Sequence, residues 1–156
     1  MSVRLADEAI SDEHELARFR AGLAGEGAVV SFMGVARSRT AAGGEVERLV
    51  LEDHPRLTAN SLEEIADSAR ARFDIASLRI VHRRGAVAPG DTIVFVAASA
   101  VHRRAAFEAV DYMMDRLKTD AVFWKREDGP DRSTWIEPRE DDRRARARWS
   151  ETPCPD

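Results

Sequence analysis

Residues 92–126 read TIVFVAASAVHRRAAFEAVDYMMDRLKTDAVFWKR, which predicts a strand, a helix and a second strand in succession. Thr92 to Ala97 form an apolar run, and a strand that is apolar along its length is expected at the centre of a sheet. From Ala106 to Leu117, apolar residues recur at helical spacing. We therefore expect a helix that begins near Ser99 and ends around Thr119.

The remaining segments predict two more helices and several short strands. Asp12 and Glu15 have the spacing of a capping box, which predicts a helix that runs to about Gly22. An apolar stripe from Leu62 to Phe73 predicts the second helix. Because strands and helices do not alternate as βαβ units throughout, we predict the α+β class, with helices packed on a mixed or largely antiparallel sheet. The strands are expected after a short extended N-terminal segment, at residues 28–33 (buried), 46–52, 78–82, 92–97, 122–126 and 133–137.

The length and composition predict one globular domain. The chain has 156 residues, of which 44% are hydrophobic, so it can bury a substantial core. We place this single domain at residues 1–140. Residues 141–156 are highly charged and close in Pro-Cys-Pro-Asp, which predicts a tail that forms a short helix or is disordered.

Charge and cysteine content exclude several classes of protein. With a net charge of -4, the chain has no global attraction for nucleic acid or for an anionic membrane. No apolar run reaches the roughly 18 residues of a membrane span, and the N-terminus is too polar for a signal peptide, so a cytoplasmic protein is expected. The single cysteine, Cys154, excludes an internal disulfide framework, and the four histidines lack metal-ligand spacing. We therefore expect neither a metal nor another cofactor.

Only two of the 24 basic residues are lysines, Lys118 and Lys125, and both lie within one short stretch. Arginine keeps its proton, whereas a desolvated lysine can lose it and act as nucleophile, base or acid. Strand alternation places Phe123, Lys125 and Glu127 on one face, and a lysine beside a bulky apolar residue is a candidate for a lowered pKa. The alternatives are chance and, for Lys118, a capping role at the helix C-terminus.

The helix expected at residues 99–119 begins with cations, although helix N-termini normally attract acidic side chains. His102, Arg103 and Arg104 crowd its first turn. Backbone N–H groups, the helix dipole and cationic side chains in one place are suited to bind a phosphate or a carboxylate. The alternative is that these arginines pair with nearby acids such as Glu108 or lie at the surface.

A second cationic group follows the strand expected at residues 28–33. Arg37 and Arg39 come after a glycine, in a loop where polar side chains are free to face a ligand. Solvated surface is the commoner role of such residues, so both interpretations stay open. The chain has no Gly-rich phosphate loop, nucleophile elbow or dinucleotide fingerprint.

Four segments carry a more specific pattern. They are GAVVSFMGVAR at 27–37, PGDTIVFV at 89–96, HRRAAFEA at 102–109, and YMMDRLK at 112–118 running into FWKRE at 123–127. Together they resemble the MoaE family, the large catalytic subunits of molybdopterin synthase. The resemblance covers about residues 3–140 in the same order, and its last block is the most specific.

The resemblance implies an α+β subunit of the MoaE hammerhead type that forms a homodimer and binds two copies of a small ubiquitin-like sulfur carrier, a 2:2 heterotetramer. The carrier's C-terminal Gly-Gly thiocarboxylate would enter a pocket and transfer sulfur twice to cyclic pyranopterin monophosphate, forming the dithiolene of molybdopterin. Lys118 and Lys125 match the active-site lysines of the family. In the family the His-Arg pair comes from the neighbouring subunit, and the substrate pocket is matched here by Arg37, His102, Arg103, Arg126 and Glu127.

Two other classes of function fit the same residues. A non-catalytic anion-binding module would use Arg37, Arg103 and Arg104 and would not need the lysines. A structural adaptor would bind the ubiquitin-like carrier without turnover. Replacement of the lysines separates these classes, because only the sulfurtransferase requires an amine that exchanges protons.

Overall fold

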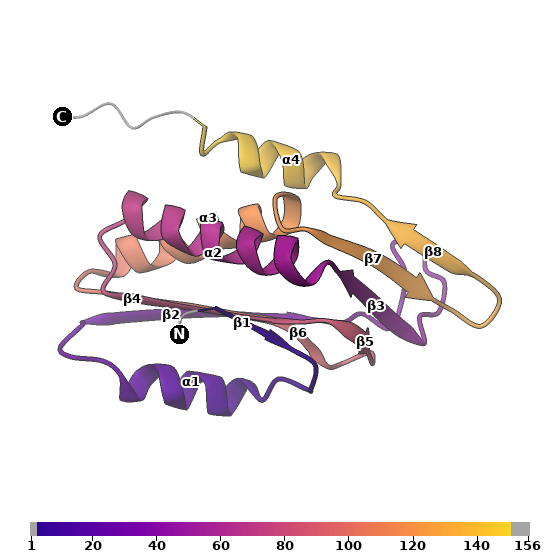
Figure 1. The fold of residues 1–156 in the computed structure, drawn as a ribbon, viewed down its shortest axis with the longest axis horizontal. Helices are drawn as coiled ribbons and strands as arrows, with labels where there is room; N and C mark the ends of the chain where they lie inside the picture. Colours follow the sequence, from indigo (N-terminus) through magenta and orange to yellow (C-terminus); the bar gives the residue numbers. More distant parts are fainter. Residues whose placement is uncertain (1–2, 151–156) are drawn as a thin grey trace.

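Two four-stranded β-sheets and four helices make up residues 3–150, the part of the chain that the computed structural model describes (Figure 1). The first sheet has the strand order β1 (Val3–Ala6), β4 (Ser77–Arg83), β6 (Thr92–Ala100) and β2 (Ala28–Val35). β1 and β4 are parallel and the other pairs are antiparallel, so the sheet is mixed. The α+β class and the central position of the strand that begins at Thr92 are therefore confirmed.

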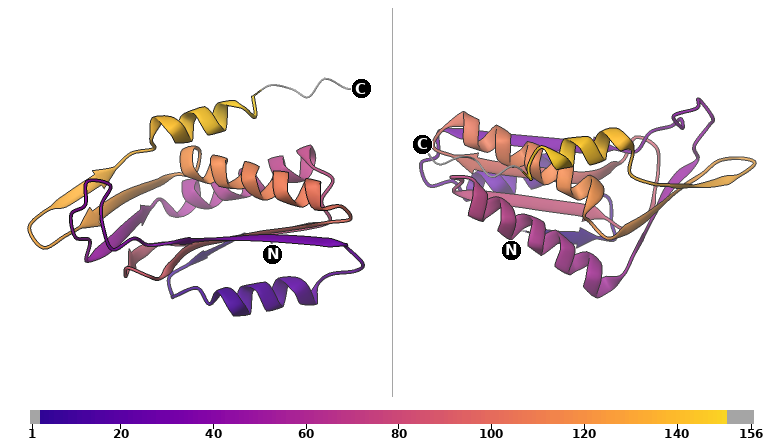
Figure 2. Two further views of the ribbon diagram at one scale, coloured as in Figure 1. Left: turned by 180° about the vertical axis from the view of Figure 1, so that it is seen from behind. Right: turned by 90° about the horizontal axis from the view of Figure 1, so that it is seen from above.

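The second sheet projects beyond one end of the first (Figure 2). Its antiparallel strands follow the order β5 (Gly85–Val87), β3 (Arg48–Asp53), β7 (Phe123–Asp128) and β8 (Ser133–Ile136). Gly85 has a φ of 76°, which favours glycine, at the point where the chain leaves β4 and enters β5. The division into two sheets was not predicted, because β3 and β7 pair from distant parts of the sequence.

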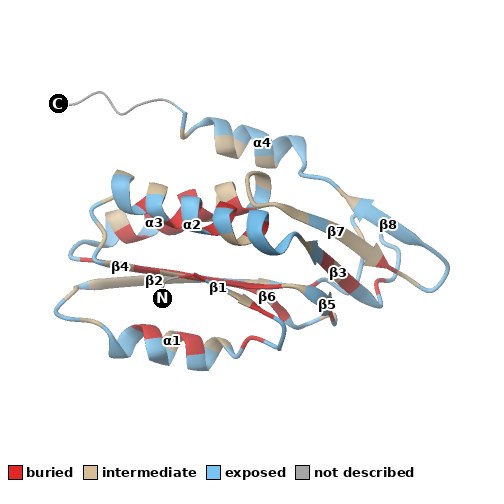
Figure 3. Cartoon of the chain, viewed as in Figure 1, coloured by how far each residue is buried: buried red, intermediate tan, exposed pale blue. Residues whose placement is uncertain are grey.

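Helices cover both faces of the first sheet. α2 (Pro55–Arg72) and α3 (Arg103–Thr119) pack on one face, and α1 (Asp12–Ala21) packs on the other. The residues that these helices turn towards the sheet are buried (Figure 3). This double covering explains why β6 is apolar along its length. No helix within residues 3–150 is long and apolar enough to cross a membrane.

The prediction that residues 28–33 form a buried strand is wrong about burial. β2 is the edge strand of the first sheet, and none of its residues is fully buried. The exposed fractions of Phe32 and Met33 are 40% and 45%, and Val35 is half exposed. An apolar run has the same appearance at the centre and at the edge of a sheet. This edge leaves an apolar surface that a partner can cover.

The start of α3 also differs from the prediction. The helix begins at Arg103 rather than near Ser99, because β6 continues to Ala100. Ser99 pairs with Val29 of β2 and is fully buried. His102 is consequently the N-cap of α3, and Arg103 and Arg104 are its first two residues.

The first two helices begin at other residues than predicted. Ser11, not Asp12, caps α1, because its hydroxyl accepts a hydrogen bond from the backbone N–H of His14. Asp12 instead accepts a hydrogen bond from the hydroxyl of Thr92 and ties the helix to β6. α2 begins at Pro55, so the predicted apolar stripe is the buried face of a longer helix.

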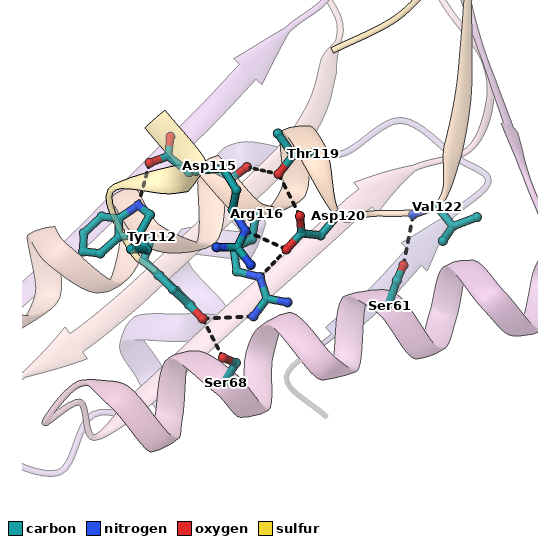
Figure 4. Close-up of polar contacts among 10 residues, drawn as sticks. Ser61, Ser68, Tyr112, Asp115, Arg116, Thr119, Asp120 and Val122 are labelled. Carbon is teal, nitrogen blue, oxygen red and sulfur yellow. Dashed lines mark hydrogen bonds and ion pairs between the residues drawn. The ribbon is translucent and has the colours of Figure 1, made fainter. Parts of the chain in front are cut away.

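The last described helix, α4 (Glu140–Ala147), lies along α3 and is held there by a shared carboxylate (Figure 4). Asp120, the C-cap of α3, accepts a hydrogen bond from Arg116 Nε at 2.6 Å and another from Arg146 Nε at 2.9 Å. Because one carboxylate binds an arginine from each helix, the end of α3 and the middle of α4 are fixed to each other.

Aromatic contacts hold the chain just after α4. The indole N–H of Trp149 donates to Asp115 at 2.7 Å, and its ring packs edge-on against Phe73 and Tyr112. The structure thus places a helix in the charged segment for which the sequence left helix and disorder open. Residues 151–156, which include Cys154, lie outside the described residues.

Candidate functional site

The two lysines of the chain meet where the second sheet joins the helices. Lys118 lies in the last turn of α3, and Lys125 lies on β7 between its register neighbours Leu51 and Ile136. The charges of the two lysines interact across this junction. A carboxylate from α4 joins them, because Asp142 Oδ1 lies 3.7 Å from Lys118 Nζ. Lys118 and Lys125, which are close in the sequence, therefore also interact in the folded chain.

The two lysines differ in burial, and this difference affects their chemistry. Lys118 is exposed and lies beside the carboxylate of Asp142. Burial lowers the pKa of Lys125 below its usual range, and the positive charge of Lys118 lowers it further, while the carboxylate of Asp142 acts in the opposite direction. Lys125 is consequently the better candidate of the two for proton exchange.

His82 of β4 interacts with Lys125, although no motif in the sequence points to it. Its ring is buried and stacks on Phe123, with ring centres 4.2 Å apart. Burial lowers the pKa of His82 to about 4, and the positive charge of Lys125 contributes, although the contact with the Arg83 carbonyl opposes the shift. Since a carbonyl only accepts, the neutral ring donates to Arg83 through Nδ1 at 2.7 Å. Strand alternation would have placed His82 in the core but not beside a lysine.

Arg37 lies at the same end of the first sheet as the lysines. It follows β2, and its buried neighbour Ala36 packs in a small core with Leu51 of β3. Arg37 and Arg39 border an open hollow of about 550 Å³. The hollow is large enough for a small ligand. One chain therefore brings Arg37 to the end of the molecule that carries both lysines.

His102 and Arg103 lie at the opposite end of α3, beside an open hollow of about 730 Å³. Gly27 and Val101 also line this hollow, and a Cβ atom at Gly27 would lie only 2.8 Å from the carbonyl oxygen of Val101. The first turn of α3 has no acidic residue, and its N-cap makes no side-chain hydrogen bond. The positive end of the helix and Arg103 thus border one hollow, where an anion site stays a prediction.

Arg104 has the pairing role that the sequence left open. Its Nε lies 3.0 Å from Glu108 Oε1, an i,i+4 pair on the helix surface. The ion pairs within residues 3–150 include neither Arg103 nor His102. The two neighbouring arginines therefore differ, since Arg104 is paired within its helix and Arg103 is open to a ligand.

The length of α3 separates its cationic start from Lys118. The rise of an α-helix puts Arg103 and Lys118 about 22 Å apart along the axis. A small molecule cannot touch both side chains of one chain at the same time. If both take part in one site, two copies of the chain must contribute to it.

Arg126 and Glu127, the other predicted pocket residues, lie on opposite faces of β7. Arg126 points away from the face of Lys125, and its Nε lies 2.7 Å from Asp128 Oδ1. Its guanidinium also lies over the ring of Trp135. Glu127 shares the face of Lys125 by strand alternation. The structure thus groups Glu127 with the lysines and ties Arg126 into the second sheet.

The lysine end of the molecule combines groups that can bind an anion and exchange a proton. Lys118 and Arg37 supply positive charge, and Lys125 supplies an amine with a lowered pKa. No group of three or more His, Cys, Asp or Glu residues within 3–150 is arranged to hold a metal ion. These side chains are suited to acid–base chemistry on an anionic substrate.

Comparison with known proteins decides the family. The family model described as "MoaE protein" matches residues 5–120, which is well over half of the chain. The chain belongs to the MoaE family. Its sequence is 45% identical over 151 residues to the molybdopterin synthase catalytic subunit of Caulobacter vibrioides. This match covers 97% of the chain and 99% of the relative. The corresponding protein of Escherichia coli K12 is 46% identical over 124 residues, covering 80% and 82% of the two chains.

The fold agrees with a solved MoaE structure. The molybdopterin biosynthesis MoaE protein from Burkholderia ambifaria superposes with a TM-score of 0.81 at 37% identity. The match covers 97% of this chain and 99% of that one. Since the coverage includes the second sheet and α4, these elements belong to the shared MoaE architecture.

Proposed function

We propose that this chain is the catalytic subunit of a molybdopterin synthase, a sulfurtransferase of molybdenum cofactor biosynthesis that works in the cytoplasm. It takes sulfur from the C-terminal thiocarboxylate of a small ubiquitin-like carrier and transfers it to cyclic pyranopterin monophosphate. The observation that carries the proposal is the interaction of Lys118 and Lys125, the only lysines of the chain, at the end of the fold that also carries Arg37. The names of its relatives support the same activity.

The proposed chemistry assigns different work to the two lysines. As the carrier sulfur attacks the pterin precursor and oxygen leaves, a group must accept and return protons. The lowered pKa of Lys125 suits it to that exchange at Nζ. Lys118 and Arg37 stabilise negative charge on the substrate and on the thiocarboxylate. Glu127 lies on the same strand face and completes this half of the pocket.

The other half of the pocket comes from a second copy of the chain in this proposal. His102 and Arg103 of one subunit bind the phosphate of a substrate held by the lysines of the other. The length of α3 supports this arrangement, because one chain cannot place Arg103 beside its own Lys118. Arg126 reaches the pocket only if it releases Asp128, so we place it at the border of the site.

Reconstitution tests the proposed function directly. The purified chain is mixed with thiocarboxylated carrier and cyclic pyranopterin monophosphate, and dithiolene formation is measured. Turnover supports the synthase. Binding of the carrier without dithiolene would indicate the adaptor, and binding of the pterin phosphate alone would indicate the anion-binding module.

The assembly is expected to be a homodimer alone and a 2:2 complex with the carrier. The exposed apolar side chains of Val101 and Phe107 near the start of α3 support a subunit contact at the His102 end. Phe32 and Met33, further along β2, extend this exposed apolar surface towards the Arg37 end. Light scattering measures both masses. A stable monomer that still forms dithiolene would contradict this prediction.

A further inference from the structure

α4 carries one carboxylate to the lysine pair, and its geometry is well defined. Asp142 Oδ1 lies 3.7 Å from Lys118 Nζ, and Asp142 Oδ2 accepts a hydrogen bond from the backbone N–H of Arg139 at 3.0 Å. The side chain of Asp142 is only 23% exposed. One oxygen is thus held by the helix start, which leaves the other for the lysines.

The docking of α4 fixes Asp142 relative to α3. Arg146, one turn further along α4, binds Asp120 at 2.9 Å. Asp120 follows Lys118 by two residues, at the C-cap of the same helix. The carboxylate and the lysine it faces therefore belong to one rigid junction, and the pair does not depend on a free surface side chain finding its partner.

Charged groups from α3, β7 and α4 meet at this junction. The charges that act on Lys125 are the positive charge of Lys118 and the negative charge of Asp142, and Asp142 also lies beside Lys118, whereas Glu127 lies two residues along β7 on the same face. His82, which faces Lys125 from β4, is neutral near pH 7 and supplies no charge. One carboxylate balances one ammonium, and interacting groups of this kind lose their protons in coupled steps.

We propose that Asp142 is a positioning residue that holds a proton on Lys118, the lysine it contacts, while Lys125 is the amine of the pair that exchanges its proton. Exposure favours the same assignment, because Lys118 is half exposed beside the carboxylate and Lys125 is packed between strands. The role of the pair in sulfur transfer rests on the proposed function, whereas the order in which the lysines titrate does not.

The lysine content of the chain makes the test direct. Protein labelled with ¹³C at the lysine ε-carbon gives two signals, because Lys118 and Lys125 are the only lysines. Substitution of each lysine by arginine assigns the signals. Titration of the full-length chain then follows the two amines separately, and the Asp142→Asn variant removes the charge while it keeps an oxygen for the Arg139 N–H.

The Lys125 signal is expected to titrate at lower pH than the Lys118 signal. Asp142→Asn is expected to move the lysine titrations to lower pH by about 0.5 to 1 unit, because the ammonium forms lose their counter-ion. The matched control is Asp141→Asn, an exposed neighbour on α4 that should move neither signal. The proposal would be overturned if Lys118 titrated at lower pH than Lys125. It would also be overturned if Asp142→Asn and Asp141→Asn shifted the lysine titrations equally.

The pH profile of sulfur transfer adds the functional readout. In Asp142→Asn the optimum is expected to move to lower pH together with the lysine signals. A titration shift without this movement would overturn the assignment of Asp142 to the reaction. Absence of sulfur transfer by the unchanged protein would instead overturn the proposed function, and the two failures are distinguishable because the lysine titrations need no substrate.

Discussion

Replacement of either Lys118 or Lys125 by alanine is expected to lower sulfur transfer by well over tenfold. A tenfold loss corresponds to about 1.4 kcal/mol of transition-state stabilisation, which is modest for a group that moves a proton or holds charge at the reacting atoms. Lys118 is half exposed and Lys125 is only partly buried, so the variants should fold. Single-turnover dithiolene formation measures the loss, and circular dichroism checks the fold.

Arginine variants distinguish proton exchange from charge. Lys125→Arg keeps the positive charge but cannot give up a proton, so it is expected to be as inactive as Lys125→Ala. Lys118→Arg is also expected to fail, since its longer planar head does not reproduce the position of the ammonium beside Asp142. Near-normal turnover in both arginine variants would contradict a catalytic role of the lysines.

The elements that the sequence predicted well are those with a local signal. The apolar run from Thr92 forms β6, and the helical stripe around Met113 forms α3. Such patterns are local because they reflect burial on both faces of a strand or on one face of a helix. Burial of β2 was predicted wrongly, since Phe32 and Met33 have the same hydrophobicity at an edge as in a core. Whether a strand has one neighbour or two depends on pairing with distant segments.

The candidate site likewise contains residues that the sequence indicates and residues that only the fold brings to it. Lys118 and Lys125 stand out in the sequence because no other lysine exists, and the structure brings them together. Asp142 has no such signal, because its contact with Lys118 depends on how α4 docks through Asp120. His82 could be predicted as a buried residue of a strand, but its place beside Lys125 arises only when the two sheets join.

Mixed dimers are expected to recover activity that neither parent variant has. Arg103→Ala homodimers lose the phosphate contact at both sites, a contact worth roughly 1.5 to 3 kcal/mol, and should need more pterin precursor. Lys118→Ala homodimers lose an active-site lysine at both sites. A heterodimer of the two variants contains one site with Lys118 from the first subunit and Arg103 from the second. If the residues act in trans, that site is intact, and about half of the unchanged dimer's activity should return.

Two affinity tags isolate the heterodimer, and a second pair of variants controls for the method. Lys118 and Lys125 meet within one chain, so a heterodimer of Lys118→Ala with Lys125→Ala leaves a defect in each site and should stay as inactive as its parents. Recovery in this control would indicate that the two lysines of one site come from different subunits. An Arg103–Lys118 heterodimer no more active than either parent would rule out the shared site, because a cis arrangement leaves one defect in every pocket.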